Sequence, residues 1–240
     1  MKYIKKGKQP SSLNAKRSTK NSSYDAPQKD WQEALLEEQG HICAYCMRRI
    51  SLDRKNGKPC IEIEHYLSQK LHSELSLRWK NMIGVCNGDT VSEGHCDKAK
   101  GKNDYKGVFV QGKANGKVKL NILNPLEISK SEKIITYSLF GEILPNVNVK
   151  DNELQNKIIK DVDCILNLNN EKLRESRADA IDSAKRTLMR KYPTGNWTTK
   201  QFDEEIKIWK SKDKDGKYKP FCQAAIWWLE KKRAKPIHKS

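Results

Sequence analysis

The sequence predicts an α+β protein with a small cysteine-stapled core, a short β region and a helical C-terminal part. Three observations indicate this. Four cysteines fall in two half-sites between residues 41 and 104, short β-type segments alternate with glycine- and asparagine-rich turns up to residue 150, and apolar residues recur at helical spacing from Asp151 onward. We therefore expect four parts: 1–24, 25–105, 106–150 and 151–240.

The composition favours a water-soluble, intracellular protein. Hydrophobic residues make up 36% of the chain, and no apolar run approaches the ~20 residues that a membrane helix needs. The basic N-terminus is not followed by the apolar segment of a secretory signal. Seven cysteines, an odd number with metal-ligand spacing, indicate a reducing compartment. The expected location is the cytoplasm, without a membrane partner.

The net charge of +17 is the second strong feature of the sequence. Such an excess of positive charge is typical of a protein with a polyanionic partner, although a lysine-rich solvated surface would also produce it. Residues 1–24 hold seven basic residues, no acidic residue and few apolar ones. They predict a flexible basic arm. This arm either binds phosphates or a partner, or it is a disordered tail.

The expected core elements follow the cysteines in order. A helix should begin at Asp30 and stop at Gly40, and a short strand should run through residues 61–64 and end at His65. Residues 71–79 predict a loop with one helical turn. Asp97, directly after a glycine-containing loop, should open a short helix because its carboxylate suits the positive end of the helix dipole.

Beyond the core, the pattern changes twice. Residues 108–110 and 118–120 predict a hairpin around a loop at 112–116, and further short strands are expected between residues 134 and 145. From Asp151 the chain predicts helices, one of them opened by a capping box of Thr198 and Gln201. The last helix carries Trp228 on its apolar face and Trp227 off it.

The cysteine spacing predicts a structural zinc site. Cys43 and Cys46 form a Cys-x-x-Cys pair, and Cys86 supplies a third thiolate. The fourth ligand is Cys96 or the adjacent His95, with Cys96 favoured because it completes an all-sulfur set. The remaining cysteines have other expected roles: an unliganded neighbour at Cys60, and small core residues at Cys164 and Cys222.

Between the two cysteine half-sites lies an acid–histidine pair, Glu64-His65. A neutral imidazole can take a proton from water near pH 7, which phosphodiester hydrolysis requires, and a cation can offset the charge that develops on the phosphate. We therefore expect His65 to be a general base, with Glu64 and Asp97 as oxygen ligands of Mg²⁺ or Mn²⁺. Glu62 replaces Glu64 as the ligand if the strand register differs.

The order Cys-x-x-Cys, Glu-His, Asn81, Cys, then Cys-Asp-x-x-Lys-Gly resembles the HNH endonuclease family. The stretches MKYIKKGKQPSSL, LLEEQGHICAYCMRRI, IEHYLSQ with LRWKNMIGVC, and ILNPLEISKSEKIITYSLFGEILP are similar to the PtuB-like HNH subunits of Septu-type and retron-associated anti-phage systems. The resemblance implies a ββα-metal core, with Asn81 orienting the loop and His65, and Lys100 near a phosphate. Two features depart from the pattern: nine residues separate Cys86 from Cys96, and Asp97 stands where Asn or His is usual.

The expected function is therefore metal-dependent cleavage of nucleic acid, DNA before RNA, as the effector of an anti-phage system. The resemblance implies a PtuA-like ABC-type ATPase as partner, and a retron reverse transcriptase and its non-coding RNA as further associates. The alternative is a non-catalytic zinc module that binds DNA or a protein. A simple zinc module has no need for Glu64-His65, Asn81 and Asp97 in this order, which favours the nuclease.

Overall fold

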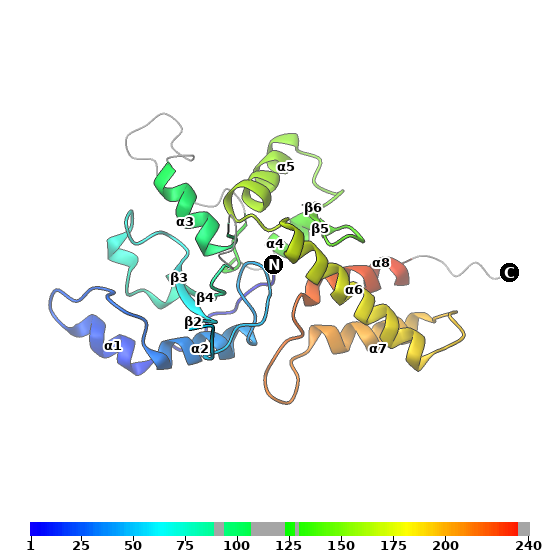
Figure 1. Ribbon diagram of the computed structural model, residues 1–240, viewed down its shortest axis with the longest axis horizontal. Coiled ribbons are helices and arrows are strands. Elements are labelled where there is room, and N and C mark those ends of the chain that lie inside the picture. The colour runs from blue at the N-terminus through cyan, green and yellow to red at the C-terminus, as the bar shows by residue number, and fades with distance from the viewer. Residues whose placement is uncertain (89–93, 107–122, 128–129, 235–240) are drawn as a thin grey trace.

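The computed structural model describes residues 1–88, 94–106, 123–127 and 130–234. Within these ranges the protein is α+β, as predicted: helices are combined with three separate two-stranded antiparallel sheets, β1–β2, β3–β4 and β5–β6. Figure 1 shows the cysteine-rich half with α1, α2 and α3 on one side, and α6, α7 and α8 on the other. The hairpin expected at residues 108–120 lies outside the described residues.

The first half is built around the β3–β4 hairpin. Strand β3 (Glu62–His65) pairs with β4 (Met82–Val85) so that Glu64 lies opposite Ile83 and His65 opposite Met82. The connection holds two short 3₁₀ turns, Ser73–Leu75 and Trp79–Asn81. Helix α3 (Asp97–Lys106) follows in the chain and begins at the predicted residue. The chain order is thus strand, strand, helix.

Two elements come before this hairpin in the chain. The first is helix α2 (Lys29–Gln39), and the second is a small ribbon of β1 (Arg54–Lys55) and β2 (Lys58–Pro59). The helix ends as predicted, because Gly40 adopts the left-handed conformation with φ of 59° and its N–H returns to the carbonyls of the last turn. Only glycine enters this region without a steric cost from a Cβ atom.

Residues 1–24 differ from the flexible arm that their composition suggests. They include α1 (Ser11–Ser18), and Ile4 and Leu13 are buried. Ser12 Oγ accepts a hydrogen bond of 2.7 Å from the indole of Trp31, and Lys6 Nζ lies 2.6 Å from a carboxylate oxygen of Glu38. The segment has too few apolar residues to fold alone, but its few apolar side chains pack against surfaces that α2 and the rest of the chain provide.

Removing the Leu13 side chain tests this packing. Leu13 is fully buried in a cluster with Trp31, Leu35 and Trp79, so Leu13→Ala should lower the free energy of unfolding by about 2–5 kcal/mol. Denaturant titration measures the change. Leu139→Ala is the matched control, since Leu139 is 59% exposed and its loss should cost little. Equal, small effects of both substitutions would mean that the arm does not pack as described.

The second half begins with a β ribbon and continues as helices. After α4 (Lys130–Ile134), strands β5 (Ile135–Tyr137) and β6 (Ile143–Pro145) form the short strands that the sequence predicts in this region. Asp151 caps α5 (Asn152–Ile159), whose last turn continues into a π-helix, Lys160–Ile165. The predicted helical region therefore starts where expected.

Three longer helices complete the chain: α6 (Glu171–Lys191), α7 (Thr199–Lys210) and α8 (Cys222–Arg233). The predicted capping box is confirmed, since Thr198 Oγ1 accepts from the Gln201 N–H and the Gln201 side chain accepts from the Thr198 N–H. Helix α8 packs against both α6 and α7, and the three lie together at the right of Figure 1. None of the helices that the structure describes combines the length and apolar character needed to cross a membrane.

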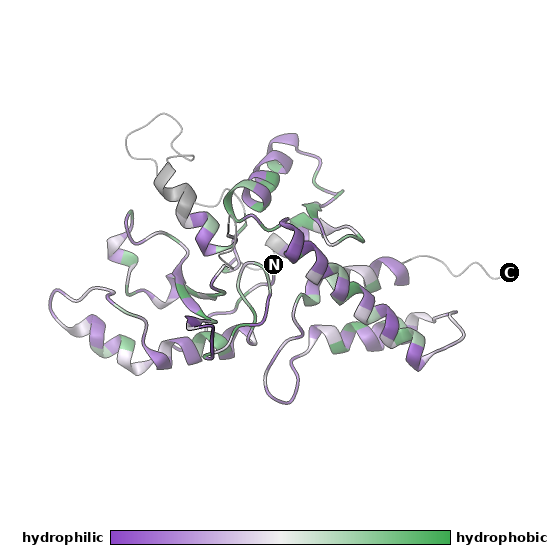
Figure 2. Ribbon diagram, viewed as in Figure 1, coloured by the Kyte–Doolittle hydropathy of each residue, from purple (hydrophilic) through white to green (hydrophobic). Residues whose placement is uncertain are grey.

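The cysteine-rich half and the C-terminal helices share one hydrophobic cluster. It joins Ile42 and Val85 near the cysteines to Ile165, Leu188 and Trp228 in the helical part. Figure 2 shows that α6 and α8 carry both green, hydrophobic residues and purple, hydrophilic ones along their length. Cys222 is buried as predicted, but the prediction that Cys164 is a core residue is wrong: the π-helix turns its side chain to solvent.

Candidate metal centre and acid–histidine site

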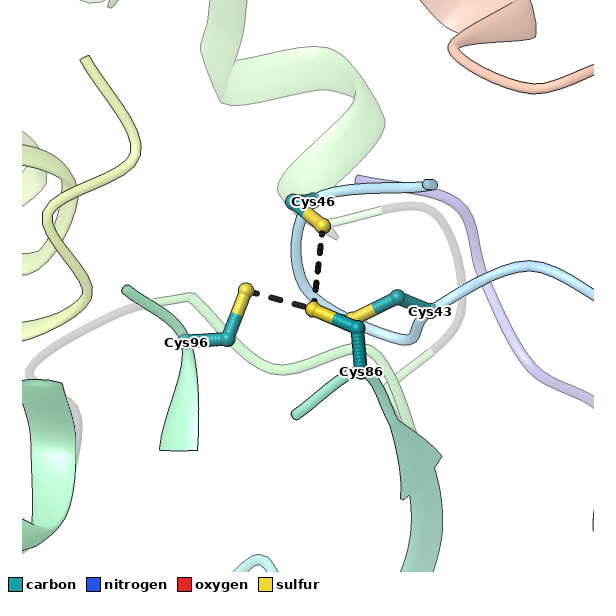
Figure 3. Close-up of side chains that lie close together, drawn as sticks. All are labelled: Cys43, Cys46, Cys86 and Cys96. Atoms are coloured by element: carbon teal, nitrogen blue, oxygen red, sulfur yellow. Dashed lines mark hydrogen bonds between the residues drawn. The ribbon is translucent and has the colours of Figure 1, made fainter. Parts of the chain in front are cut away.

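Four buried cysteines meet at one point of the molecule (Figure 3). Cys43 and Cys46 come from the knuckle between α2 and β1, Cys86 follows β4, and Cys96 directly precedes α3. Their sulfur atoms all lie within 4.8 Å of one another. Residues distant in sequence are thus brought together, as their spacing predicts.

The geometry of the cluster fits a tetrahedral metal ion rather than disulfides. The sulfur atoms of Cys43 and Cys96 are 3.9 Å apart, and those of Cys46 and Cys86 are 3.7 Å apart. A disulfide requires about 2.05 Å. Zinc–sulfur bonds of about 2.3 Å in a tetrahedron place the sulfurs about 3.8 Å from one another. The four side chains can therefore hold a metal ion such as zinc without moving far.

The thiols also favour ionisation at one position. Burial opposes the charge on Cys43, but hydrogen bonds from Cys46, Cys86 and Cys96 outweigh it and hold the pKa of Cys43 well below its usual value. A metal ion needs thiolates as ligands.

The cysteine knuckle is fixed by a buried glutamine. The Gln39 amide donates to the carbonyls of Ile42 and Gly84, and its oxygen accepts from the Gly84 N–H at 2.7 Å. A further hydrogen bond, from the Ala44 N–H to the Gly84 carbonyl, also links the cysteine knuckle to β4. A side chain at position 84 would crowd this junction, because a Cβ atom would lie 3.3 Å from the Gln39 side chain and 3.2 Å from Ile61.

His95, the alternative fourth ligand, lies against the cluster. Its Nδ1 is 3.2 Å from the Cys96 sulfur and 3.8 Å from the Cys86 sulfur. The four cysteines form a complete set without it. Cys60 stays outside this set, half-buried beside the β1–β2 ribbon.

The end of β3 carries the acid–histidine pair, and the start of α3 faces it. The buried carboxylate of Glu64 accepts hydrogen bonds from Lys100 Nζ and, at 3.3 Å, from the Tyr45 hydroxyl. Asp97 adjoins the same carboxylate; burial and the Glu64 charge together raise the pKa of Asp97 to about 8. Two carboxyl groups thus share one site beside the metal centre.

Lys100 is the cation within this site. It is 3% exposed, and besides Glu64 it donates to the carbonyls of His65 and Tyr66 at 3.2 and 3.1 Å. All three donors of the ammonium group are directed into the protein. In this structure Lys100 therefore offsets the charge of the carboxylates instead of facing solvent, where a phosphate would approach.

Both ring nitrogens of His65 have partners. Nε2 lies 2.7 Å from the Ser76 carbonyl oxygen, and Nδ1 lies 3.0 Å from the side-chain nitrogen of Gln69. A carbonyl can only accept, so Nε2 carries the hydrogen and Nδ1 keeps its lone pair. Burial lowers the pKa of His65, which favours the neutral ring. The Tyr24 ring packs edge-on against the imidazole at 4.7 Å between centroids.

Asn81 ties together the loop between β3 and β4. Its oxygen accepts from the Leu67 N–H at 2.8 Å, and its amide donates to the carbonyls of Leu67 and Leu75 at 3.0 and 3.4 Å. The Ser76 carbonyl that holds His65 belongs to this loop. The side chain of Asn81 thus lies where it can position His65 through the loop.

Glu62, the alternative to Glu64, points to a different partner. Its carboxylate lies 2.9 Å from Lys98 Nζ, and it is less buried than Glu64. The register places Glu62 opposite Val85 and two residues farther from the end of the strand. Of the two carboxylates, Glu64 is the one beside Asp97 and Lys100.

Several contributors were not apparent from the sequence. Gln69 follows His65 by four residues, and Tyr24, Tyr45 and Gln39 come from distant segments, so no motif spacing marks them. His72, within the loop that Asn81 ties together, is buried at 5% exposure. The pairing of Tyr24 with His65 is a tertiary contact with no sequence signal.

The fold and site define an α+β protein with a buried four-cysteine cluster beside an acid–histidine pair. No family model matches the chain. The sequence is similar to the Septu protein PtuB of Bacillus thuringiensis, with 28% identity over 120 residues. The match covers 49% of this chain and 38% of that protein, so most of the relative's length lies outside it.

Proposed function

We propose that this protein is a metal-dependent endonuclease of the HNH type that cleaves DNA in defence against phage. The observation that carries the proposal is the meeting of Glu64 and His65 at the end of β3 with Asp97 at the start of α3. The strand–strand–helix order and the adjacent cysteine cluster support a ββα-metal core. Similarity to a Septu protein supports the defence role.

His65 is the general base of the proposed reaction. The Ser76 carbonyl holds the Nε2–H, which leaves the Nδ1 lone pair for a proton. Gln69 occupies that position in the structure, and a water molecule that displaces its amide would meet the acceptor nitrogen directly. Nδ1 takes a proton from this water, and the water oxygen forms a bond to phosphorus. The leaving oxygen departs with the electrons of its broken bond and takes a proton from solvent.

Glu64 and Asp97 are the proposed ligands of a catalytic cation. Both are oxygen donors, and burial together with the neighbouring Glu64 charge raises the pKa of Asp97. Bound Mg²⁺ or Mn²⁺ would stabilise the negative charge that develops on the phosphate. Zinc is the proposed occupant of the four-cysteine cluster, where it fixes the start of α3 and therefore Asp97.

The net charge of +17 supports a nucleic-acid substrate. The alternative function, a zinc module that only binds DNA or protein, has the same charge and the same cysteine cluster. It does not account for a buried carboxyl pair next to a histidine whose two nitrogens are both held in place.

Two neighbouring glutamates separate these functions. Glu64→Gln should reduce cleavage of plasmid DNA with Mg²⁺ or Mn²⁺ by at least about a hundredfold, because it removes one charged ligand of the cation. Glu62→Gln, the same change two residues away, should keep most of the activity. A wild-type protein that binds DNA without cutting it in either metal would favour the binding module, and a reversed order of the two variants would make Glu62 the ligand.

We further propose a PtuA-like ABC-type ATPase as the partner that restrains the nuclease, with a retron reverse transcriptase and its RNA as further associates. An unrestrained nuclease would damage the DNA of its own host. Co-expression with such an ATPase, followed by measurement of mass in solution, should give a complex with lower basal cleavage than the free chain. A chain that stays monomeric in the presence of the ATPase and cuts at an unchanged rate would contradict this partner.

A further inference from the structure

Neutral groups hold the buried charge of Arg177 on α6. Its side chain is 0% exposed, and its hydrogen bonds within the described ranges go to the carbonyls of Gly141 and Leu168 and to the side chain of Asn169. Its Nη1 has no hydrogen-bond partner among the residues that the structure describes. Within the same residues, no carboxylate lies at ion-pair distance from Arg177.

The free-energy cost of burying the Arg177 charge must be offset by other interactions. A guanidinium group stays protonated at any physiological pH, so it cannot escape the cost of burial by losing its proton. An unpaired charge in a protein interior costs several kcal/mol. Neutral carbonyls offset part of this cost, but a nearby negative charge is the usual solution.

The position of Arg177 points to the cysteine cluster. The Leu168 carbonyl that accepts from Arg177 belongs to the turn after the π-helix, and two residues earlier the Leu166 carbonyl accepts from the Cys96 N–H at 2.8 Å. On the same turn, the Asn167 amide donates to the Gly94 carbonyl at 2.8 Å. This turn, residues 166–169, therefore separates the guanidinium from the metal-binding segment.

The electrostatics agree with this position. Burial lowers the pKa of Arg177, while Tyr137, Cys46 and Cys96 act in the opposite direction, which places both cysteines within the range of its charge. Four thiolates around one divalent zinc ion carry a net charge of −2, because four negative charges meet two positive ones. Protonated thiols would carry none.

We propose that Arg177 is the buried counter-charge of the four-cysteine metal centre, held beside it by the turn 166–169. The guanidinium stabilises the thiolate form of the cluster and so links metal binding to the packing of α6. This inference rests on the proposed metal centre but not on nuclease activity. It assigns a role to the helical half, which the HNH motif does not cover.

Metal competition with a chromophoric chelator at one fixed pH tests the proposal. Arg177→Met should weaken zinc binding about 10–100-fold, the range typical of partners that support metal ligands. Arg177→Lys, which keeps the charge, should stay within about threefold of the wild type. The matched control is Arg174→Met on the same helix, since Arg174 is partly exposed and lies 3.6 Å from Glu142. It should bind zinc as the wild type does.

The absorption spectrum of the Co²⁺-loaded proteins shows whether all four thiolates still bind. An unchanged spectrum in Arg177→Met, together with weaker binding, supports the counter-charge; binding equal to the wild type overturns it. If Arg177→Met does not fold, Arg177→Gln, which removes the charge but keeps hydrogen-bond donors, decides: weaker zinc binding than in Arg177→Lys supports the proposal, and equal binding contradicts it. A wild-type chain that retains no metal would instead refute the metal centre itself.

Discussion

Replacing Cys43 with serine is expected to unfold the cysteine-rich half of this protein. Cys43 is one of the four clustered cysteines, and its sulfur lies 3.9 Å from that of Cys96. Serine is a poor zinc ligand. Structural zinc sites contribute apparent binding free energies of about 10–16 kcal/mol, as large as the whole stability of a typical domain, about 5–15 kcal/mol. Circular dichroism and metal analysis should show lost structure and loss of about one bound zinc per chain.

Cys60→Ser and Cys164→Ser are the controls for this prediction. Cys60 is close in sequence but outside the cluster, and Cys164 is exposed, so both variants should keep the metal and melt close to the wild type. A stable, cooperatively folded Cys43→Ser variant would show that the cluster is not a structural site. Removal of zinc from the wild type with a strong chelator should reproduce the effect of Cys43→Ser.

Replacing His65 with alanine is expected to lower cleavage about 10²–10⁴-fold, the contribution typical of a general base. DNA affinity and zinc content should remain, because His65 is only 4% exposed and its partners are Ser76, Gln69 and Tyr24 rather than the cysteines. The loss should therefore appear in the cleavage rate at saturating DNA rather than in binding.

A control histidine lies outside the site. His41 has a positive φ of 58°, a conformation that asparagine tolerates, so His41→Asn should leave both the fold and the cleavage rate intact. Full cleavage by His65→Ala would assign the protein to the binding modules instead. A His65→Ala variant that loses its cooperative melting would mean that the ring is required for packing, and Gln69→Ala would then test the site with less disturbance.

The sequence by itself determined the parts of the structure that depend on local chemistry. Gly40 predicts the end of α2, Asp97 the start of α3, and Thr198 with Gln201 the start of α7, because caps and turns involve neighbouring residues. The four cysteines could be selected because metal ligands recur at restricted spacings. In the same way, alternation marks β3 and places His65 at its end.

Only the tertiary structure decided the contacts between distant segments. It packed residues 1–24, which their composition marks as flexible, against α2 through Leu13 and Ser12. It directed Lys100 into the carboxylates, and it brought Arg177 to the turn that holds Cys96. Such placements depend on the buried surface and charge that remote residues offer, and no local spacing records them. Sequence patterns can therefore identify the chemical groups of this site, whereas the groups that position and neutralise them emerge only when the chain is folded.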